Sequence, residues 1–186
     1  MTKAEVIDCL ERAPVIAAIT DNAWANALAA PVEMLFYLHA NINTLCDRIA
    51  EAHAAKKHLL VHLDLADGIA KDRAGLEFLA KAGVDGIIST RSQAVHLAKE
   101  AGLLTVQRCF ALDSQGTESI SEVLRTAAPD LLEIMPGVIG KLIDRFSAGS
   151  IPVIAGGLIE TKAEVTAALR SGAVAVSTGK QDLWYS

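Results

Sequence analysis

Short apolar runs recur along the chain, and most are followed by a stretch whose apolar residues repeat with the period of an amphipathic helix. The runs have the length of strands. Their near-continuous hydrophobicity is typical of parallel strands that are covered on both faces. The predicted strands are Val15–Ile19, Met34–His39, Leu59–Asp64, Gly86–Thr90, Leu104–Arg108, Leu131–Met135, Pro152–Ala155 and Ala173–Ser177.

Helical patterns lie between these strands, and several have recognisable ends. Glycine tolerates the left-handed backbone of a helix C-terminus, so the pairs Ala82–Gly83, Ala101–Gly102 and Ser171–Gly172 predict helix ends. Thr161 and Glu164 have the spacing of a capping box at a helix start. The predicted helices are Asn43–Lys56, Arg73–Ala82, Ser92–Ala101, Ser119–Ala127, Val138–Phe146 and Ala163–Ser171, with a turn or two more around Trp24–Leu28.

Eight strands joined by helical crossovers predict an α/β fold, a (β/α)8 barrel of the TIM type formed by residues 1–186 as a single domain. Such barrels typically need about 250 residues. We therefore expect a compact version with short loops and some reduced helices. The competing fold is a doubly wound open sheet, for which a glycine-rich turn is expected after the first strand. The sequence there is AAITDNAW, which contains no glycine.

Composition narrows the class of protein. Apolar residues make up 52% of the chain and aromatic residues only 4%, which predicts an aliphatic core and excludes a disordered chain. Cys9, Cys46 and Cys109 lie far apart and form no CxxC pair. This spacing indicates reduced thiols in a cytoplasmic protein and argues against a zinc site.

Charge and hydropathy limit the partners. No apolar run approaches the roughly 20 residues of a membrane span. Acidic residues stand near the N-terminus, where a signal peptide would be apolar, so neither export nor a membrane is predicted. The net charge of −5 gives the whole chain no electrostatic footprint for nucleic acid. Local basic clusters, Lys56–Lys57–His58 and Lys141 with Arg145, are equally typical of solvated helix ends.

Two neighbouring strands of the predicted barrel end in glycine and other small residues. Gly156 and Gly157 follow the seventh strand, while Ser177, Thr178 and Gly179 follow or end the eighth. Barrels often bind a phosphate on the loops after these strands. Glycine lets the backbone approach a ligand closely, and its N–H groups then hold an anion. A tight turn alone would also explain the glycine pair, but the two adjacent ends together favour phosphate binding.

Ionisable side chains follow several other predicted strands. His62 and Asp64 are expected on one face of the third strand, and Ser89 and Arg91 on one face of the region ending the fourth. His62 and Asp64 could be metal ligands. No third ligand has diagnostic spacing, so no metal is predicted.

Glu133 is the only charge within the apolar run of the sixth strand. A buried carboxylate must be paired, so we expect a partner in Arg91, Arg108 or a ligand hydroxyl. A structural Arg–Glu pair at the barrel mouth is the alternative. Gln107 and Arg108 are successive and cannot both point inward on a regular strand, so their roles stay open.

These strand ends together predict a site for a small phosphorylated polyol. Glycine backbone would bind the phosphate, and Asp64, Glu133 and an arginine would bind the hydroxyls. Whether the ligand is only bound or also turned over stays open. Asp64 and Glu133 could act as acid and base in an isomerase or aldolase. Spacing reveals no pair of nucleophile and base, so no catalytic residue and no cofactor are predicted.

The same strand ends resemble the glycerol-3-phosphate-responsive antiterminators, bacterial proteins that regulate genes of glycerol catabolism. The resemblance runs from PVIAAI at Pro14–Ile19 to DLW at Asp182–Trp184. Its most specific segments, in order, are DGIISTRS (85–92), TVQRCFALDS (105–114) and LEIMPGVI (132–139). VHLDLADGI (61–69), IPVIAGGLI (151–159) and AVAVST (173–178) also match.

The resemblance implies a compact barrel that senses glycerol 3-phosphate and acts on leader mRNA to prevent premature transcription termination. It implies a regulator rather than an enzyme, and a homo-oligomer is compatible with it. RNA binding is expected from the resemblance alone. The expected ligand-binding residues are Asp64, Arg91, Arg108, Glu133, Gly156, Gly157, Ser177 and Thr178. The chain departs from the family pattern after the first strand, where Thr20 replaces a basic residue, and after the second, where His39 and Asn41 stand.

Overall fold

The computed structural model describes residues 3–111 and 114–185, and its eight strands close into one parallel barrel. Each strand pairs with its neighbours in chain order, and β8 closes the ring on β1. The predicted (β/α)8 fold is confirmed. The strands are β1 (Val15–Ile19), β2 (Met34–Tyr37), β3 (His58–His62), β4 (Gly86–Ser89), β5 (Leu104–Phe110), β6 (Leu131–Met135), β7 (Val153–Gly156) and β8 (Ala175–Thr178).

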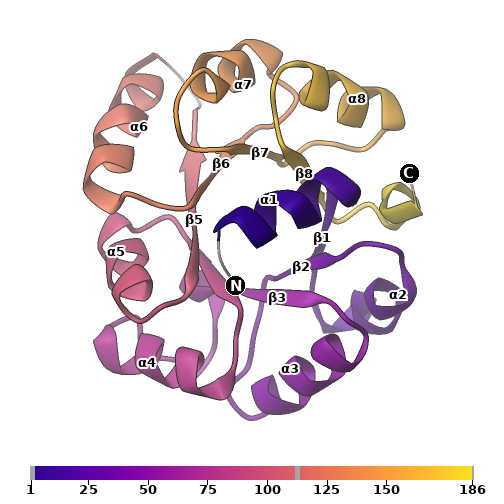
Figure 1. Cartoon of the computed structure of the whole chain (residues 1–186), viewed down its shortest axis with the longest axis vertical. Helices are drawn as coiled ribbons and strands as arrows, with labels where there is room; N and C mark the ends of the chain where they lie inside the picture. The colour runs from indigo at the N-terminus through magenta and orange to yellow at the C-terminus, as the bar shows by residue number, and fades with distance from the viewer. Residues whose placement is uncertain (1–2, 112–113, 186) are drawn as a thin grey trace.

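The helices form a ring outside the barrel (Figure 1). Several are short, which explains how the fold fits into 186 residues. They are α2 (Trp24–Ala29), α3 (Leu45–Ala54), α4 (Arg73–Ala82), α5 (Ser92–Glu100), α6 (Ser114–Ala127), α7 (Gly140–Ser147) and α8 (Lys162–Arg170), with 3-10 turns η1 (Asp21–Ala23), η2 (Leu63–Leu65) and η3 (Gln181–Tyr185). None of the described helices has the length and apolar composition needed to cross a bilayer.

The predicted helix ends are confirmed by the backbone. Gly83, Gly102 and Gly172 have φ values of 92°, 80° and 99°. At the start of α8, Thr161 accepts a hydrogen bond from the Glu164 amide, and the Glu164 side chain accepts one from the Thr161 amide. This capping box fixes where the loop after β7 ends.

No element is predicted before β1, but the structure places helix α1 (Lys3–Arg12) there. Figure 1 shows α1 lying across one end of the barrel. Val6, Cys9 and Leu10 are buried and pack against interior strand residues such as Ile16 and Leu131. The helix therefore closes the end where the strands begin, and leaves the other end for a site.

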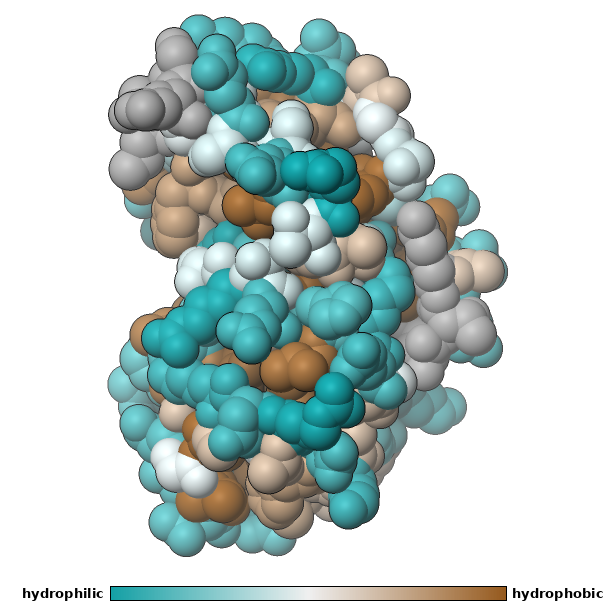
Figure 2. Space-filling view, turned by 90° about the vertical axis from the view of Figure 1, so that its left-hand side faces the viewer, coloured by the Kyte–Doolittle hydropathy of each residue, from teal (hydrophilic) through white to brown (hydrophobic). Residues whose placement is uncertain are grey.

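The core has two layers. Inward-pointing strand residues and α1 form the inner cluster, and outward-pointing strand residues pack against the helices in the outer one. On the face over α4, α5 and α6, hydrophilic residues predominate and apolar residues appear in smaller patches (Figure 2). This distribution is typical of amphipathic helices that cover a barrel.

Candidate functional site

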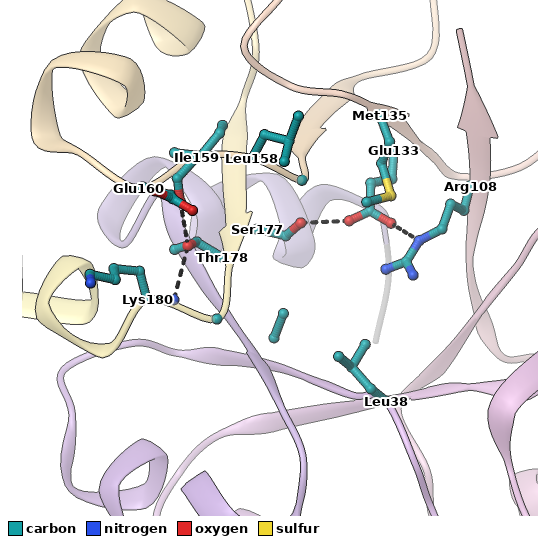
Figure 3. A pocket seen from close by; sticks show the side chains of 13 residues that line it. Leu38, Arg108, Glu133, Met135, Leu158, Ile159, Glu160, Ser177, Thr178 and Lys180 are labelled. Carbon is teal, nitrogen blue, oxygen red and sulfur yellow. Dashed lines mark hydrogen bonds and ion pairs between the residues drawn. The ribbon is translucent and has the colours of Figure 1, made fainter. Parts of the chain in front are cut away.

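A cavity of about 390 Å³ opens where the strands end, which is the usual place for a ligand in this fold (Figure 3). Its volume is at the small end of the range of ligand pockets. The polar lining includes Arg108, Glu133, Ser177, Thr178, Glu160 and Lys180. The apolar lining includes Ala18, Leu38, Met135, Leu158 and Ile159.

Glu133 and Arg108 form a buried ion pair at one side of this cavity. The Glu133 side chain is fully buried and that of Arg108 is 11% exposed, with 2.5 Å between Arg108 Nε and Glu133 Oε2. The Ser177 hydroxyl donates to Glu133 Oε1 at 2.5 Å. Of the partners expected for Glu133, the structure therefore selects Arg108. Both oxygens of the carboxylate are held by charge-assisted hydrogen bonds.

Strand parity settles the roles of Gln107 and Arg108. Leu104 and Val106 belong to the barrel interior, so Arg108 follows them inward. Gln107 points outward, where its Nε2 donates to the carbonyl oxygens of Ser89 and Thr90 at 3.3 and 3.0 Å. Gln107 thus joins β5 to the end of β4 and takes no part in the cavity.

Gly156 is the last residue of β7 and lies directly behind the ion pair. A Cβ on Gly156 would be 2.5 Å from Glu133 Oε1 and 2.8 Å from Ser177 Oγ. Any side chain here would therefore displace the carboxylate or the hydroxyl. Gly156 is not among the residues that line the cavity. Its absent side chain gives Glu133 and Ser177 the space to meet.

The loops after β7 and β8 contribute Gly157, Leu158, Ile159 and Gly179 to the lining of the cavity. Gly157 and Leu158 have φ values of 75° and 60°, a left-handed backbone that leucine adopts only at a cost. Among the described residues, no recorded hydrogen bond outside the helices and strands has the amide of Gly157, Leu158, Ile159 or Gly179 as its donor. Unpaired amides that converge in a hollow make an anion site.

Neighbouring donors are already engaged. The amides of Glu160 and Thr161 donate to the Glu164 carboxylate. The Thr178 hydroxyl donates to the carbonyl of Ile159 at 2.8 Å and accepts from the Lys180 amide at 3.1 Å. Thr178 therefore ties the two loops together. The amides of Gly157, Leu158, Ile159 and Gly179, for which no such bond is recorded among the described residues, are called here the amide cradle.

The structure does not bring Asp64 and Arg91 into this cavity. Strand β3 ends at His62 and η2 follows, so the expectation that His62 and Asp64 share a strand face is wrong. Strand β4 ends at Ser89, so the same expectation for Ser89 and Arg91 is also wrong. The Arg91 side chain is 61% exposed, with its Nε 3.8 Å from Asp64 Oδ1. Neither residue lines the cavity.

Asp64 instead fixes the turn after β4. Its carboxylate accepts hydrogen bonds from the Ser89 hydroxyl at 2.7 Å, the Thr90 amide at 2.7 Å and the Thr90 hydroxyl at 2.9 Å. Burial alone would raise the pKa of Asp64, but these three bonds outweigh it and hold the pKa below its ordinary value. Asp64 is a support for the rim beside the cavity.

Replacing Asp64 by Asn should destabilise the protein by about 1–3 kcal/mol at pH 7, because the donors lose a charged acceptor. Since the folded pKa is depressed, this stabilisation is present above the unfolded pKa of about 3.9 and is lost as the pH falls through the folded value. Urea unfolding should show that the difference in free energy of unfolding between wild type and variant is smaller below pH 4 than at pH 7. The exposed Asp144, replaced by Asn, serves as the control. A difference independent of pH would contradict this account of the carboxylate.

His62 lies on the interior face of β3, two residues after the interior Leu60, and is 4% exposed. Burial lowers the pKa of His62, and the charge of Arg108 lowers it further, so the ring is neutral at pH 7. Within residues 3–111 and 114–185, no group of three or more His, Cys, Asp or Glu side chains could hold a metal ion.

Several residues that line the cavity could not be predicted from the sequence. Ala18, Leu38 and Met135 are ordinary apolar residues at strand ends, with no local pattern that separates them from core positions. Leu158 is 68% exposed beside the cavity, and its left-handed backbone is visible only in three dimensions. The sequence could have pointed to Lys180 through its place directly after Gly179.

Comparison with known proteins adds independent findings. The family model described as glycerol-3-phosphate responsive antiterminator matches residues 15–184. The chain is 30% identical over 182 residues to the protein YgcP of Escherichia coli K12, covering 96% of this chain and 95% of that protein.

Two solved structures are similar throughout. The glycerol uptake operon antiterminator regulatory protein of Listeria monocytogenes is 34% identical, with a TM-score of 0.86 and coverage of 91% of this chain and 94% of that one. A glycerol uptake operon antiterminator-related protein of Thermotoga maritima is 30% identical, with a TM-score of 0.82 and coverage of 91% and 96%. Barrel enzymes such as a putative deoxyribose-phosphate aldolase, at 12% identity and a TM-score of 0.72, share the fold alone.

Proposed function

The chain belongs to the family of glycerol-3-phosphate responsive antiterminators, and from this premise we propose that it is a cytoplasmic regulator that binds glycerol 3-phosphate in the mouth of its barrel. In this proposal the bound protein acts on the leader mRNA of glycerol catabolism genes. Binding, rather than turnover of the ligand, is its activity.

One observation carries the ligand part of the proposal, namely two chemically different ends within one small cavity. The amides of Gly157 and Gly179 would hold the phosphate at one end. Arg108 and Glu133 would exchange hydrogen bonds with the hydroxyl groups at the other. Phosphate and hydroxyl groups are the two functional groups of glycerol 3-phosphate.

Not all of the ligand residues expected from the sequence contact the ligand in this proposal. Arg108, Glu133 and Gly157 do, and Ser177 orients Glu133. Gly156 leaves space for Glu133 behind the cavity, whereas Thr178 lines the cavity and joins its two loops. Asp64 and Arg91 support the adjacent rim.

The RNA part of the proposal rests on family membership. The net charge of −5 gives it no general electrostatic support. One predicted basic cluster also loses a member, because Lys57 is only 6% exposed and its ammonium donates to the carbonyls of Ala30 and Val32. Neither interpretation of this cluster, a basic surface or a solvated helix end, holds for Lys57.

The alternative is a phosphosugar isomerase or aldolase that uses Asp64 and Glu133 as acid and base. Asp64 lies outside the cavity, so the two carboxylates do not face one substrate. The lysine that lines the cavity, Lys180, stands on the loop after β8 rather than on a strand. The position of Asp64 therefore favours the regulator.

Incubation with glycerol 3-phosphate and with triose phosphates, followed by NMR, tests this choice. We expect no product and a thermal stabilisation by glycerol 3-phosphate that grows with its concentration, since a ligand that binds the native state raises stability by RT ln(1 + [L]/Kd). Sustained product formation at enzyme-like rates would contradict the regulator proposal and support the enzyme. Absence of stabilisation by any of these compounds would refute the ligand site.

A further inference from the structure

The charges that line the cavity are divided between two sides. Figure 3 shows Arg108 and Glu133 on one side, and Glu160 and Lys180 on the other. Arg108 and Glu133 neutralise each other through their ion pair. His62, which lies near both, is neutral at pH 7 because burial and the charge of Arg108 lower its pKa. The side opposite Lys180, called here the inner end, therefore has no net charge.

The carboxylate at the inner end cannot move aside for a ligand. Glu133 Oε1 accepts from Ser177, and Oε2 accepts from Arg108. Behind it, the backbone of Gly156 comes so close that a Cβ would be 2.5 Å from Oε1. A fixed, fully buried carboxylate is thus a permanent part of the ligand environment.

An anionic group would gain little at the inner end. Arg108 would attract it and Glu133 would repel it at similar distances, so the two effects largely cancel. The anion would still have to leave water, and a buried charge without a compensating partner is strongly disfavoured. The loops after β7 and β8 instead carry Lys180, and their own carboxylate, Glu160, is exposed to solvent.

A hydroxyl group fits the same place. It donates one hydrogen bond and accepts others, so it can give its proton to the free lone pairs of Glu133 and accept from a guanidinium. Nε of Arg108 points at Glu133, while its two terminal nitrogens face the cavity (Figure 3). Leu38 and Met135 also line the cavity, where they can contact a short carbon chain.

We infer that Glu133 makes the inner end a specificity filter, which admits a phosphorylated ligand whose far terminus is an uncharged hydroxyl group and disfavours one whose far terminus is a carboxylate. The inference rests on the proposed function, because it presumes that the phosphate is held by the amide cradle. It goes further by assigning the discrimination among small phosphates to one residue.

Calorimetric titration of the full chain with three probes tests the filter: glycerol 3-phosphate, 3-phosphoglycerate and inorganic phosphate. In wild type we expect 3-phosphoglycerate to bind at least about tenfold more weakly than glycerol 3-phosphate. In Glu133→Gln, with folding checked by circular dichroism, the ratio of the affinity for glycerol 3-phosphate to that for 3-phosphoglycerate should fall at least about fivefold, because the repelling charge is gone. Glu100→Gln removes the same charge from the exposed pair with Arg73 on the helical surface and should leave the ratio unchanged.

The outcomes separate the inference from the function on which it rests. If all three probes bind and 3-phosphoglycerate equals or exceeds glycerol 3-phosphate in wild type, the phosphate site stands and the filter is overturned. An unchanged ratio in folded Glu133→Gln also overturns the filter. If none of the probes binds, the proposed function fails and the filter with it. Even if the variant does not fold, the ratio of the two affinities in wild type can still overturn the filter.

Discussion

Replacing Glu133 by Gln should lower the stability of the ligand-free protein by about 3 kcal/mol, at the lower end of the 3–5 kcal/mol typical when one partner of a buried ion pair is removed. The volume is preserved, but Arg108 loses its counter-charge, and the 11% exposure of Arg108 limits the loss. For a chain of this size the Tm should fall by about 6–12 °C. Calorimetric melting without ligand measures this.

The same variant reports on ligand contact. Because Glu133 is expected to bind a hydroxyl group, glycerol 3-phosphate should raise the Tm of Glu133→Gln less than that of wild type. A larger rise would mean instead that the freed Arg108 receives the phosphate. Glu100→Gln is the control, since exposed pairs contribute about 0.2–1 kcal/mol. No change in stability or in ligand response would remove Glu133 from the site.

Replacing Gly157 by Val should abolish the stabilisation by glycerol 3-phosphate, with affinity reduced by at least about 100-fold as charge-assisted bonds from the cradle are lost. Gly157 has a φ of 75°, where a β-branched residue is strained, and an added Cβ would lie 2.6 Å from Met135 Cε. Relief of either strain moves the amide cradle. The protein should remain folded, because the Met135 side chain is flexible at the contact.

Gly102 provides a matched control for the backbone effect. It has a φ of 80°, and a Cβ there would meet nothing within 4 Å. Gly102→Val should therefore lose about 1–2 kcal/mol of stability through its left-handed backbone and retain full ligand affinity. Titration calorimetry of the two variants distinguishes disruption of the amide cradle from general backbone strain as the cause of lost affinity. Unchanged affinity in Gly157→Val would place the phosphate elsewhere.

Most of the barrel follows from the hydrophobic pattern. The predicted bounds of β1, β6 and α4 coincide with those in the structure, because turn residues or charges mark both ends of each run. Strand β3 was predicted to end two residues too late, since Leu63 continues the apolar run while the backbone already turns into η2. Where a run and a turn overlap, local pattern does not locate the boundary.

Helix α1 was missed for a different reason. The segment carries Val6, Cys9 and Leu10 at helical spacing between its acidic residues. These apolar residues can be assigned to the core only when the barrel end that they cover is known. Tertiary packing, rather than the local sequence, determines the role of α1.

The candidate site was predictable where chemistry forces a contact. A lone carboxylate in an apolar strand requires a partner, and the structure supplies Arg108. Asp64 was misplaced because strand alternation was extended past the end of β3. Gly156 matters because an added Cβ would lie 2.5 Å from Glu133 Oε1 on the neighbouring strand, and no sequence pattern contains this closeness.

A crystal structure of the complex with glycerol 3-phosphate tests the central claim most directly. The account predicts phosphate oxygens within hydrogen-bonding distance of the Gly157 and Gly179 amides, and a hydroxyl group of the ligand on the Glu133 carboxylate. A phosphate bound to Arg108 instead, or a ligand outside the mouth of the barrel, would contradict it.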